Sequence, residues 1–569
     1  MNQKTIIFFT TNPLFIAIKK FFDNILFSIK KDFKFLLVLF FTFLVTLFIS
    51  FIDVSGGQTV MTLSLSDYEI GQISDRTLIA EKDLSPTVEN PVSITKGEKL
   101  LRKGFPISEV DYQKLKKIAE APSYIDYERF VQSVFFFLLL FLFAYFLFSK
   151  ILLGKLIQIK EVVFLSVLFV IIYALTVMGS KIPPFDSMLS LPIIIPSALV
   201  AILVSVLFGY LDSIYFSLIV TFCIFYETGF QPIPGLFALC SCFTAAKIVK
   251  NMDKRIQIVF ASLELAITNT IYLVLLYIIF RGSVEKIALF DILGIAFNGF
   301  ISGILALGFL TPLESLLNTA SVFRLMDLSD LNSPLMKKML LTAPGTYNHS
   351  MLVATLAENA AHAIGANALL ARVGAYYHDI GKLEQPEYFV ENQREGNKHD
   401  EINPRLSVSV IRRHVKKGKE KAQQMRFPQE VIDIISQHHG NSVIGYFYAE
   451  AKKLDENVSP EEFSYQEDPP SSRESAIVML ADTVEASTRT LERPSVSRLE
   501  KFIRQRIMEK YEHHQLDKSA LTFNDLDTIL DSFVKILGGY YHSRIEYPNQ
   551  KDPDEVDTQD NSGEKTEDK

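Results

Sequence analysis

The sequence predicts an all-α protein with two main parts. The first is a polytopic helical membrane bundle of one anchor plus seven spans, and the second is an all-helical cytoplasmic domain. A chain of 569 residues is too long for one soluble domain, and its 49% hydrophobic content is high for a wholly soluble protein. After Pro312, apolar residues recur every three or four positions, which indicates amphipathic helices, and no alternating strand pattern is evident.

Eight apolar runs predict the bundle. Each approaches the roughly 17 to 25 residues that a membrane-spanning helix needs, although some are short. No cleavage motif follows the first run, so we interpret it as an uncleaved anchor. The runs lie near 35–52, 130–149, 161–179, 189–211, 212–227, 234–249, 258–280 and 289–311.

Basic residues in the short loops predict the orientation of the spans. Such residues concentrate on the cytoplasmic side of a membrane. One cluster precedes the first run, a second lies between the second and third runs, and a third lies between the sixth and seventh runs. All three therefore fall on the same side of the membrane. Eight crossings from a cytoplasmic start return the chain to the cytoplasm at Pro312. The polar stretch 53–129 then forms a short extracytoplasmic region, with alternating segments followed by a helical pattern over 109–120.

A constellation of histidines and aspartates in the second half predicts a two-metal hydrolytic site. None of the ten histidines precedes His349. Imidazole and carboxylate ligands suit iron, manganese and zinc, and an aspartate directly after a histidine can bridge two ions. Any one of these histidines alone is better explained as an ordinary surface or core residue, but their joint spacing argues against that. The candidate ligands are His349, His378, Asp379, His414, His438, His439 and Asp482.

Such a site suits hydrolysis of a phosphodiester. Two ions about 3.5 to 4 Å apart lower the pKa of a bridging water and bind the attacking and leaving oxygens. Lys382, one turn beyond the His-Asp pair, can neutralise a nonbridging phosphate oxygen in the transition state, although a lysine at a helix end is also favoured by the helix dipole. We expect Asn392 and Gln393, in the polar stretch 388–400, to lie near the substrate.

Several long motifs carry a family resemblance. They closely resemble the cytoplasmic domain of the PgpH-type 7TM-HD family, bacterial membrane-bound phosphodiesterases of cyclic di-AMP, and the likeness covers nearly all of 312–548. The motifs are LTAPGTYNHSMLVATLAENAA (341–361), LLARVGAYYHDIGKLEQPEYFVENQ (369–393), DIISQHHGNS (433–442), AIVMLADTVEAS (476–487) and HSRIEYP (542–548).

The resemblance implies a division of the ligands between two ions, manganese or iron. His349, His378, Asp379 and Asp482 would bind one ion, and Asp379, His414, His438 and His439 the other. It also implies hydrolysis of cyclic di-AMP to pApA at the bacterial inner membrane, with the HD domain in the cytoplasm. The sequence departs from the family pattern at Asn348, in the run EDPP (467–470), in the run HHQL (513–516), and in the shortness of 53–129, and none of these departures removes a ligand.

Three other functions stay open at this point. They are hydrolysis of cyclic di-GMP, hydrolysis of another nucleotide, and nucleotide binding without catalysis.

The expected partners are a cyclic dinucleotide, the lipid bilayer and, as an open question, a second copy of the chain. The net charge of −7 gives no indication of binding to polymeric nucleic acid. The predicted domains are 1–34, 35–52, 53–129, 130–311, a connecting helix at 312–334, the HD domain at 335–548 and a disordered acidic tail at 549–569.

Overall fold

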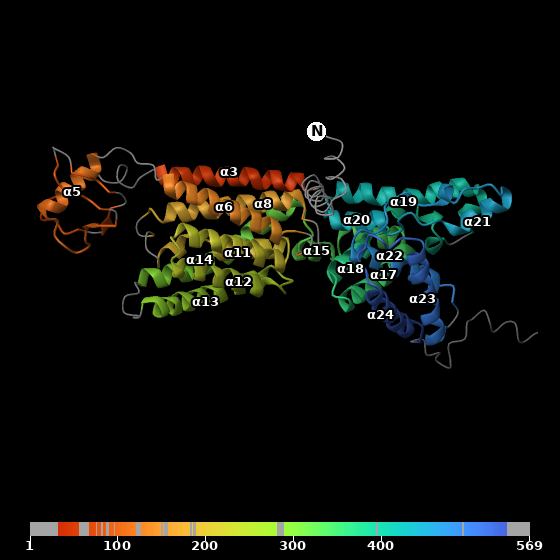
Figure 1. Ribbon diagram of the computed structural model, residues 1–569. Helices are drawn as coiled ribbons and strands as arrows, with labels where there is room; N and C mark the ends of the chain where they lie inside the picture. Colours follow the sequence, from red (N-terminus) through yellow and green to blue (C-terminus); the bar gives the residue numbers. More distant parts are fainter. Residues whose placement is uncertain are drawn as a thin grey trace, which may run out of the picture. The chain divides into compact units, whose positions relative to one another are not determined.

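The computed structural model is mostly helical, as the sequence predicts (Figure 1). It divides into two compact units, Met1–Thr311 and Pro312–Lys569. The predicted segment 1–34 lies almost wholly outside the described residues, and the predicted tail 549–569 lies wholly outside them. The structure describes residues 32–55, 68–74, 77–80, 83–86, 90–95, 97–120, 127–149, 152, 157–182, 185, 189–281, 289–393, 396–491 and 494–542.

The first unit contains the membrane bundle. Of the described residues, seven helices are long and apolar enough to cross a membrane. The remaining predicted span, the fourth in chain order at 189–211, is instead divided into two shorter helices, α9 (Leu191–Ile194) and α10 (Ser197–Leu207). Pro196 separates them because proline has no backbone N–H to continue the helical hydrogen bonds. The seven long helices are α3 (Phe33–Ser55), α6 (Tyr127–Leu147), α8 (Ile159–Gly179), α11 (Tyr210–Glu227), α12 (Pro232–Val249), α13 (Ile256–Arg281) and α14 (Leu289–Leu317).

Four charged side chains join helix ends at one end of the bundle. Arg129 Nη2 lies 3.1 Å from Asp53 Oδ2 and 3.4 Å from Glu227 Oε1. Lys181 Nζ pairs with the Asp53 carboxylate and donates to its backbone carbonyl at 3.3 Å. Both carboxylates are almost completely buried. We call Asp53, Arg129, Lys181 and Glu227 the bundle-end ion cluster.

The bundle-end ion cluster shows which helix ends lie at the same end of the bundle. Lys181 lies two residues beyond the end of α8, and Glu227 ends α11, so both helices finish at the same end of the bundle. The chain must therefore return between them, and α9 and α10 make this return. The Phe208 ring, just after α10, packs 5.7 Å from that of Phe164 near the start of α8. The short helix pair thus crosses the bundle despite its break.

The described part of 53–129 contains a small sheet that the all-α prediction did not include. Strand β1 (Leu78–Ile79) pairs antiparallel with β2 (Lys99–Leu101). Helix α5 (Glu109–Glu120) occupies the stretch predicted to be helical. Its start is fixed by reciprocal hydrogen bonds between Ser108 and Asp111.

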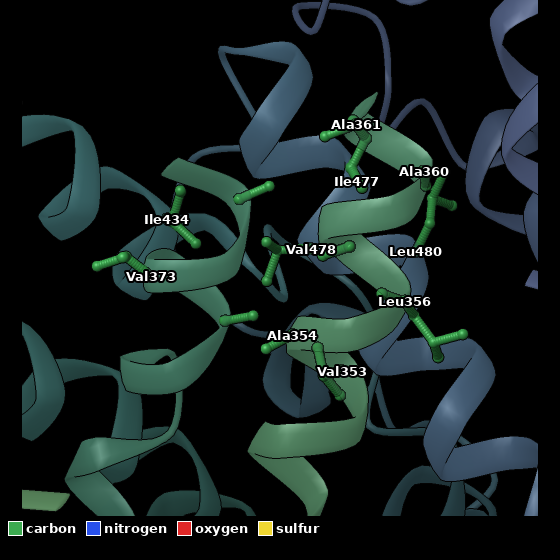
Figure 2. Packing of buried hydrophobic residues seen from close by; sticks show 14 of the residues in the cluster. Val353, Ala354, Leu356, Ala360, Ala361, Val373, Ile434, Ile477, Val478 and Leu480 are labelled. Atoms are coloured by element: carbon green, nitrogen blue, oxygen red, sulfur yellow. The ribbon is translucent and has the colours of Figure 1, made fainter. Parts of the chain in front are cut away.

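The second unit is an all-helical domain built around α17, α18, α20 and α22. Figure 2 shows the side chains of Ile477, Val478 and Leu480 on α22 packed with those of α17. Ala354, Ala357, Ala360 and Ala361 on α17 are buried, and their small side chains allow close approach of the neighbouring helices. The elements are α15 (Val322–Leu328), α16 (Pro334–Thr342), α17 (Pro344–Ala363), α18 (Ala368–Tyr377), η3 (Ile380–Glu384), η4 (Pro386–Tyr388), η5 (Val390–Asn392), η6 (Lys398–Glu401), α19 (Pro404–Gln424), α20 (Gln429–Gln437), α21 (Gly445–Leu454), η7 (Pro460–Phe463), α22 (Arg473–Thr488), α23 (Val496–Glu512) and α24 (Phe523–His542).

The stretch 312–334, predicted as a connecting helix, forms the end of α14, then α15 and the first residue of α16. It is bonded to the rest of the helical domain. Asn318 Nδ2 donates to the Phe427 carbonyl at 3.0 Å, and Tyr377 Oη donates to the Leu328 carbonyl at 2.7 Å.

Candidate metal centre

The fold brings all seven predicted ligands into one buried cluster. Each comes from a helix or from the residues that end one. The His349 side chain projects from the second turn of α17, and Asp482 lies on α22. The His-Asp and His-His pairs lie where α18 and α20 end, and His414 lies inside α19. Five of the seven are less than 5% exposed, Asp482 is 7% exposed, and the His439 side chain is 21% exposed.

Two glycines allow these elements to meet. A Cβ on Gly381 would lie 1.8 Å from the His414 carbonyl oxygen, so only glycine lets η3 pack directly on α19. Gly440 follows the His-His pair with a φ of 54°, in the left-handed region, and turns the chain away after α20. The glycines of the HDIG and HHG runs therefore serve geometry and bring the ligands together.

The Asp379 carboxylate faces a different pair of histidines with each oxygen. Oδ2 lies 3.2 Å from His378 Nε2 and 3.6 Å from His349 Nε2. Oδ1 lies 3.4 Å from His414 Nε2 and 3.8 Å from His438 Nε2. This is the arrangement that a carboxylate bridging two ions requires.

Asp482 and His439 lie beside the two pairs of histidines that face Asp379. Asp482 Oδ1 lies 3.1 Å from His349 Nε2 and 3.8 Å from His378 Nε2. Asp482 Oδ2 lies 3.6 Å from His439 Nδ1. Ligand atoms within 4.8 Å of one another form three groups: His349, His378 and Asp482; His378, Asp379 and His438; and His414, His438 and His439.

Two buried polar atoms at the centre have no hydrogen-bond partner within the described residues. They are His378 Nε2 and Asp379 Oδ1. Leaving such an atom unsatisfied in a protein interior costs about 1–3 kcal/mol. Because both are good ligand atoms for a divalent ion, the cluster fits a metal and its chemistry favours nitrogen-and-oxygen-binding ions.

Three histidines are oriented by their own helices. The Nδ1 atoms of His378, His414 and His438 lie 2.7, 2.5 and 2.8 Å from the carbonyl oxygens three residues earlier. When Nδ1 carries the proton and donates it to a carbonyl, Nε2 keeps the lone pair that a metal needs. The backbone therefore points all three Nε2 atoms toward the centre.

His349 is oriented by a carboxylate. Its Nδ1 lies 2.5 Å from Glu485 Oε2. Arg489 donates to the other Glu485 oxygen through Nε and Nη2, at 2.9 and 2.7 Å. The sequence analysis missed Glu485, although it stands three residues after Asp482 and therefore on the same face of α22.

Burial leaves three of the ligand histidines in the neutral form that metal binding needs, whereas the carboxylates beside His349 favour its protonated form. Burial lowers the pKa of His414 to about 4 and that of His438 to about 3. Burial, reinforced by His438, holds the pKa of His439 well below its usual range. Although burial opposes it, hydrogen bonding to Asp482 and Glu485 raises the pKa of His349 to about 9. Three imidazoles are thus neutral near pH 7, with lone pairs free for ligation.

Lys382 lies beside the centre, held between two carboxylates. Its Nζ is 2.7 Å from Asp379 Oδ2 and 2.8 Å from Glu391 Oε1. Burial opposes the charge, but these carboxylates raise the pKa of Lys382 and keep it cationic. Glu391 also accepts a hydrogen bond from Thr346 Oγ1 at 3.0 Å. The sequence analysis missed Glu391, which stands directly before the predicted Asn392.

Asn392 and Gln393 lie near this network but bond within the protein. Asn392 Oδ1 accepts the Thr346 N–H at 3.2 Å, and its Nδ2 donates to Thr346 Oγ1 at 2.8 Å. Gln393 Nε2 donates to Asn397 Oδ1 at 3.2 Å. A Cβ on Gly345 would lie 1.8 Å from the Glu391 carbonyl oxygen. The APGTY and VENQ motifs are therefore joined to each other in the fold.

A tyrosine that no sequence pattern indicated covers His439. The Tyr465 ring stacks on the His439 ring with 4.3 Å between centroids and 22° between planes. Its backbone N–H donates to the Ser442 carbonyl at 3.0 Å, which fixes it beside the turn after α20. Tyr465 thereby forms one wall of the centre.

Two protein families match the chain, each over a separate stretch. Residues 128–321 match the family described as "7TM receptor with intracellular HD hydrolase". Residues 346–487 match the family described as "HD domain", which includes all seven predicted ligands.

Among curated proteins, the chain is similar to two called "Cyclic-di-AMP phosphodiesterase PgpH". It is 37% identical to that of Bacillus subtilis over 62% of this chain and 51% of the relative. It is 38% identical to that of Listeria monocytogenes over 56% of this chain and 44% of the relative. The chain thus spans about half the length of the curated relatives it matches.

A solved structure of the L. monocytogenes PgpH HD domain in complex with cyclic di-AMP is 41% identical. The match covers 37% of this chain and all of that one, with a TM-score of 0.37.

Proposed function

We propose that this chain is a metal-dependent phosphodiesterase that hydrolyses cyclic di-AMP to pApA. It is a multi-pass membrane protein in which a 7TM membrane domain is joined to an HD domain. The observation that carries the chemistry is the Asp379 carboxylate, whose two oxygens face two separate pairs of histidines. The substrate is supported by the names of the two similar curated proteins, both cyclic-di-AMP phosphodiesterases.

The proposed ligands divide as the resemblance implies. His349, His378, Asp379 and Asp482 would hold one divalent ion, and Asp379, His414, His438 and His439 would hold the other. We propose manganese or iron, because histidine and carboxylate ligands suit both. When bound, such a pair supplies an activated water and stabilises the charge of an in-line displacement at phosphorus.

The protein's own residues position and neutralise the substrate. Lys382 is cationic and lies beside the carboxylate that joins the two ligand sets, so it is placed to face a nonbridging phosphate oxygen. Glu391 holds the Lys382 side chain in that position. Asn392 and Gln393 are proposed to lie near the nucleotide, with Asn392 acting through Thr346. The HD domain would face the cytoplasm at the bacterial inner membrane.

A substrate panel tests the proposal. The full-length protein, purified in detergent and loaded with manganese or ferrous iron, is incubated with cyclic di-AMP, cyclic di-GMP and a nucleoside triphosphate. We expect pApA from cyclic di-AMP with metal and none after chelation. Cleavage of cyclic di-GMP or the triphosphate with cyclic di-AMP left intact would reassign the substrate. Tight binding of cyclic di-AMP without cleavage would favour a receptor.

A further inference from the structure

Lys510 is a cation near the metal centre that lacks a carboxylate partner. It lies in the last turn of α23 and is half-buried. Its Nζ donates to Ser442 Oγ at 2.9 Å. Within the described residues, no carboxylate lies within 4.0 Å of its Nζ. Because charges in protein interiors are normally paired, this lysine has capacity to bind an anion.

The turn after the His-His pair holds Lys510 in place. Gln515 Nε2 donates to Asn441 Oδ1 at 2.6 Å, and Gln515 Oε1 accepts the Asn441 N–H at 3.3 Å. Lys510 bonds to the next residue, Ser442, so two contacts attach 510–515 to the turn that follows His439. Gln515, in the HHQL run that departs from the family pattern, therefore helps to attach Lys510 to this turn.

The surroundings of Lys510 connect it to the metal centre. Burial lowers its pKa, and the nearby Asp482 and Glu509 only partly oppose that effect. Asp482 is itself one of the proposed ligands, and the Lys510 partner Ser442 lies three residues after His439. Lys382, in contrast, is already compensated by Asp379 and Glu391. The two lysines thus lie near the same centre with different capacities for an added negative charge.

We propose that Lys510 binds the phosphate of the cyclic dinucleotide that is not being cleaved. The inference rests on the proposed function. A cyclic dinucleotide has two phosphodiesters, and the two-metal centre acts on one at a time. The other phosphodiester remains anionic, and a cation close to the metal centre would compensate its charge. Lys510 is then a determinant of specificity for substrates with two phosphates and takes no part in bond cleavage.

The test compares substrates with two phosphodiesters and with one. Full-length manganese-loaded protein is assayed with cyclic di-AMP and with bis(p-nitrophenyl) phosphate, which has a single phosphodiester. Lys510→Met should raise KM for cyclic di-AMP roughly tenfold or more, as expected for losing a hydrogen bond to a charged group. It should change the turnover of bis(p-nitrophenyl) phosphate less than about twofold. Lys510→Arg should restore most of the affinity for cyclic di-AMP.

The controls separate this role from a structural one. Lys501→Met, on the exposed face of the same helix, should change neither substrate's kinetics. Ser442→Ala should raise KM for cyclic di-AMP less than Lys510→Met does, because the lysine keeps its charge. Metal content of each variant reports on folding of the centre.

Two results would overturn the proposal. An unchanged KM for cyclic di-AMP in Lys510→Met, or an equal loss of activity on both substrates with reduced metal content, would remove the phosphate-binding role. If the unaltered protein cleaved bis(p-nitrophenyl) phosphate but not cyclic di-AMP, the proposed function would fail first, and the role of Lys510 with it.

Discussion

Two buried clusters of charged residues in this chain differ in what they leave unsatisfied. In the bundle-end ion cluster, Asp53 is paired with Arg129 and Lys181, and Glu227 is paired with Arg129. In the HD domain, Asp379 and Asp482 are surrounded mainly by imidazoles, and Asp379 Oδ1 and His378 Nε2 have no hydrogen-bond partner in the described part of the chain.

The difference separates a structural cluster from a binding site. A cluster whose charges compensate one another holds helix ends together and needs no further ligand. A cluster that leaves buried ligand atoms unpaired carries a free-energy cost that a bound ion would relieve. Changes to the first cluster should therefore act on stability, and changes to the second on metal content and turnover.

The largest expected effect is at Asp379, because it faces both sets of histidines. Asp379→Ala should lose both ions and all detectable turnover, measured by elemental analysis and by pApA formation. His439→Ala is the matched comparison and should lose at most one ion, since His439 belongs to one set. Two ions still bound to Asp379→Ala would remove the bridging role.

Lys382 should matter to turnover more than to metal binding. Lys382→Ala should keep both ions but slow cleavage of cyclic di-AMP by roughly 10²-fold or more, as expected for losing a partner of the transition-state charge. Lys416→Ala, an exposed lysine on α19, serves as the control. If Lys382→Ala kept its metals and the full rate, Lys382 would be an ordinary buried ion-pair residue.

Glu485 should have a smaller effect, because it acts through His349. Glu485→Gln removes the negative charge beside the His349 imidazole and should weaken metal affinity by roughly 10- to 100-fold, as for other residues that orient a ligand. Excess manganese should restore most of the turnover. Lost activity that no metal concentration restores would point to a direct catalytic role for Glu485.

The bundle-end ion cluster should affect stability with almost no effect on chemistry. Arg129→Gln leaves Glu227 without its cation and should destabilise the bundle by about 1–3 kcal/mol, seen as a lower melting temperature in detergent. Metal content and kcat of the loaded protein should change less than about twofold. A large loss of kcat with normal metal content would show that the bundle takes part in the active unit.

The sequence predicted the parts of the molecule that depend on spacing and periodicity. The family resemblance and the mostly helical fold are confirmed, and the fold brings the seven candidate ligands together. The metal-binding roles and the domain limits stay predictions. The break at Pro196 was missed because the apolar run is continuous in composition.

Residues that act through three-dimensional contacts were not found from the sequence. Glu391 reaches Lys382 only because η5 folds back beside η3. Tyr465 and Lys510 belong to no recognisable motif, and they reach the turn after α20 through tertiary packing. The alternating segments noted in 53–129 include β2, but no sheet was predicted there, because the strands have only two and three residues.

The contact at Gly381 has a consequence for the choice of metal. The peptide of Gly381 lies directly on the backbone of His414, so two proposed ligand regions, Asp379 and His414, are joined through the main chain. A side chain can adjust to an ion of different radius by rotating, but two backbones in contact cannot move closer. Selectivity among hard and borderline ions depends on the size and rigidity of the cavity. Discrimination by ionic radius would then originate in the main chain, at a residue that has no side chain and binds no ion.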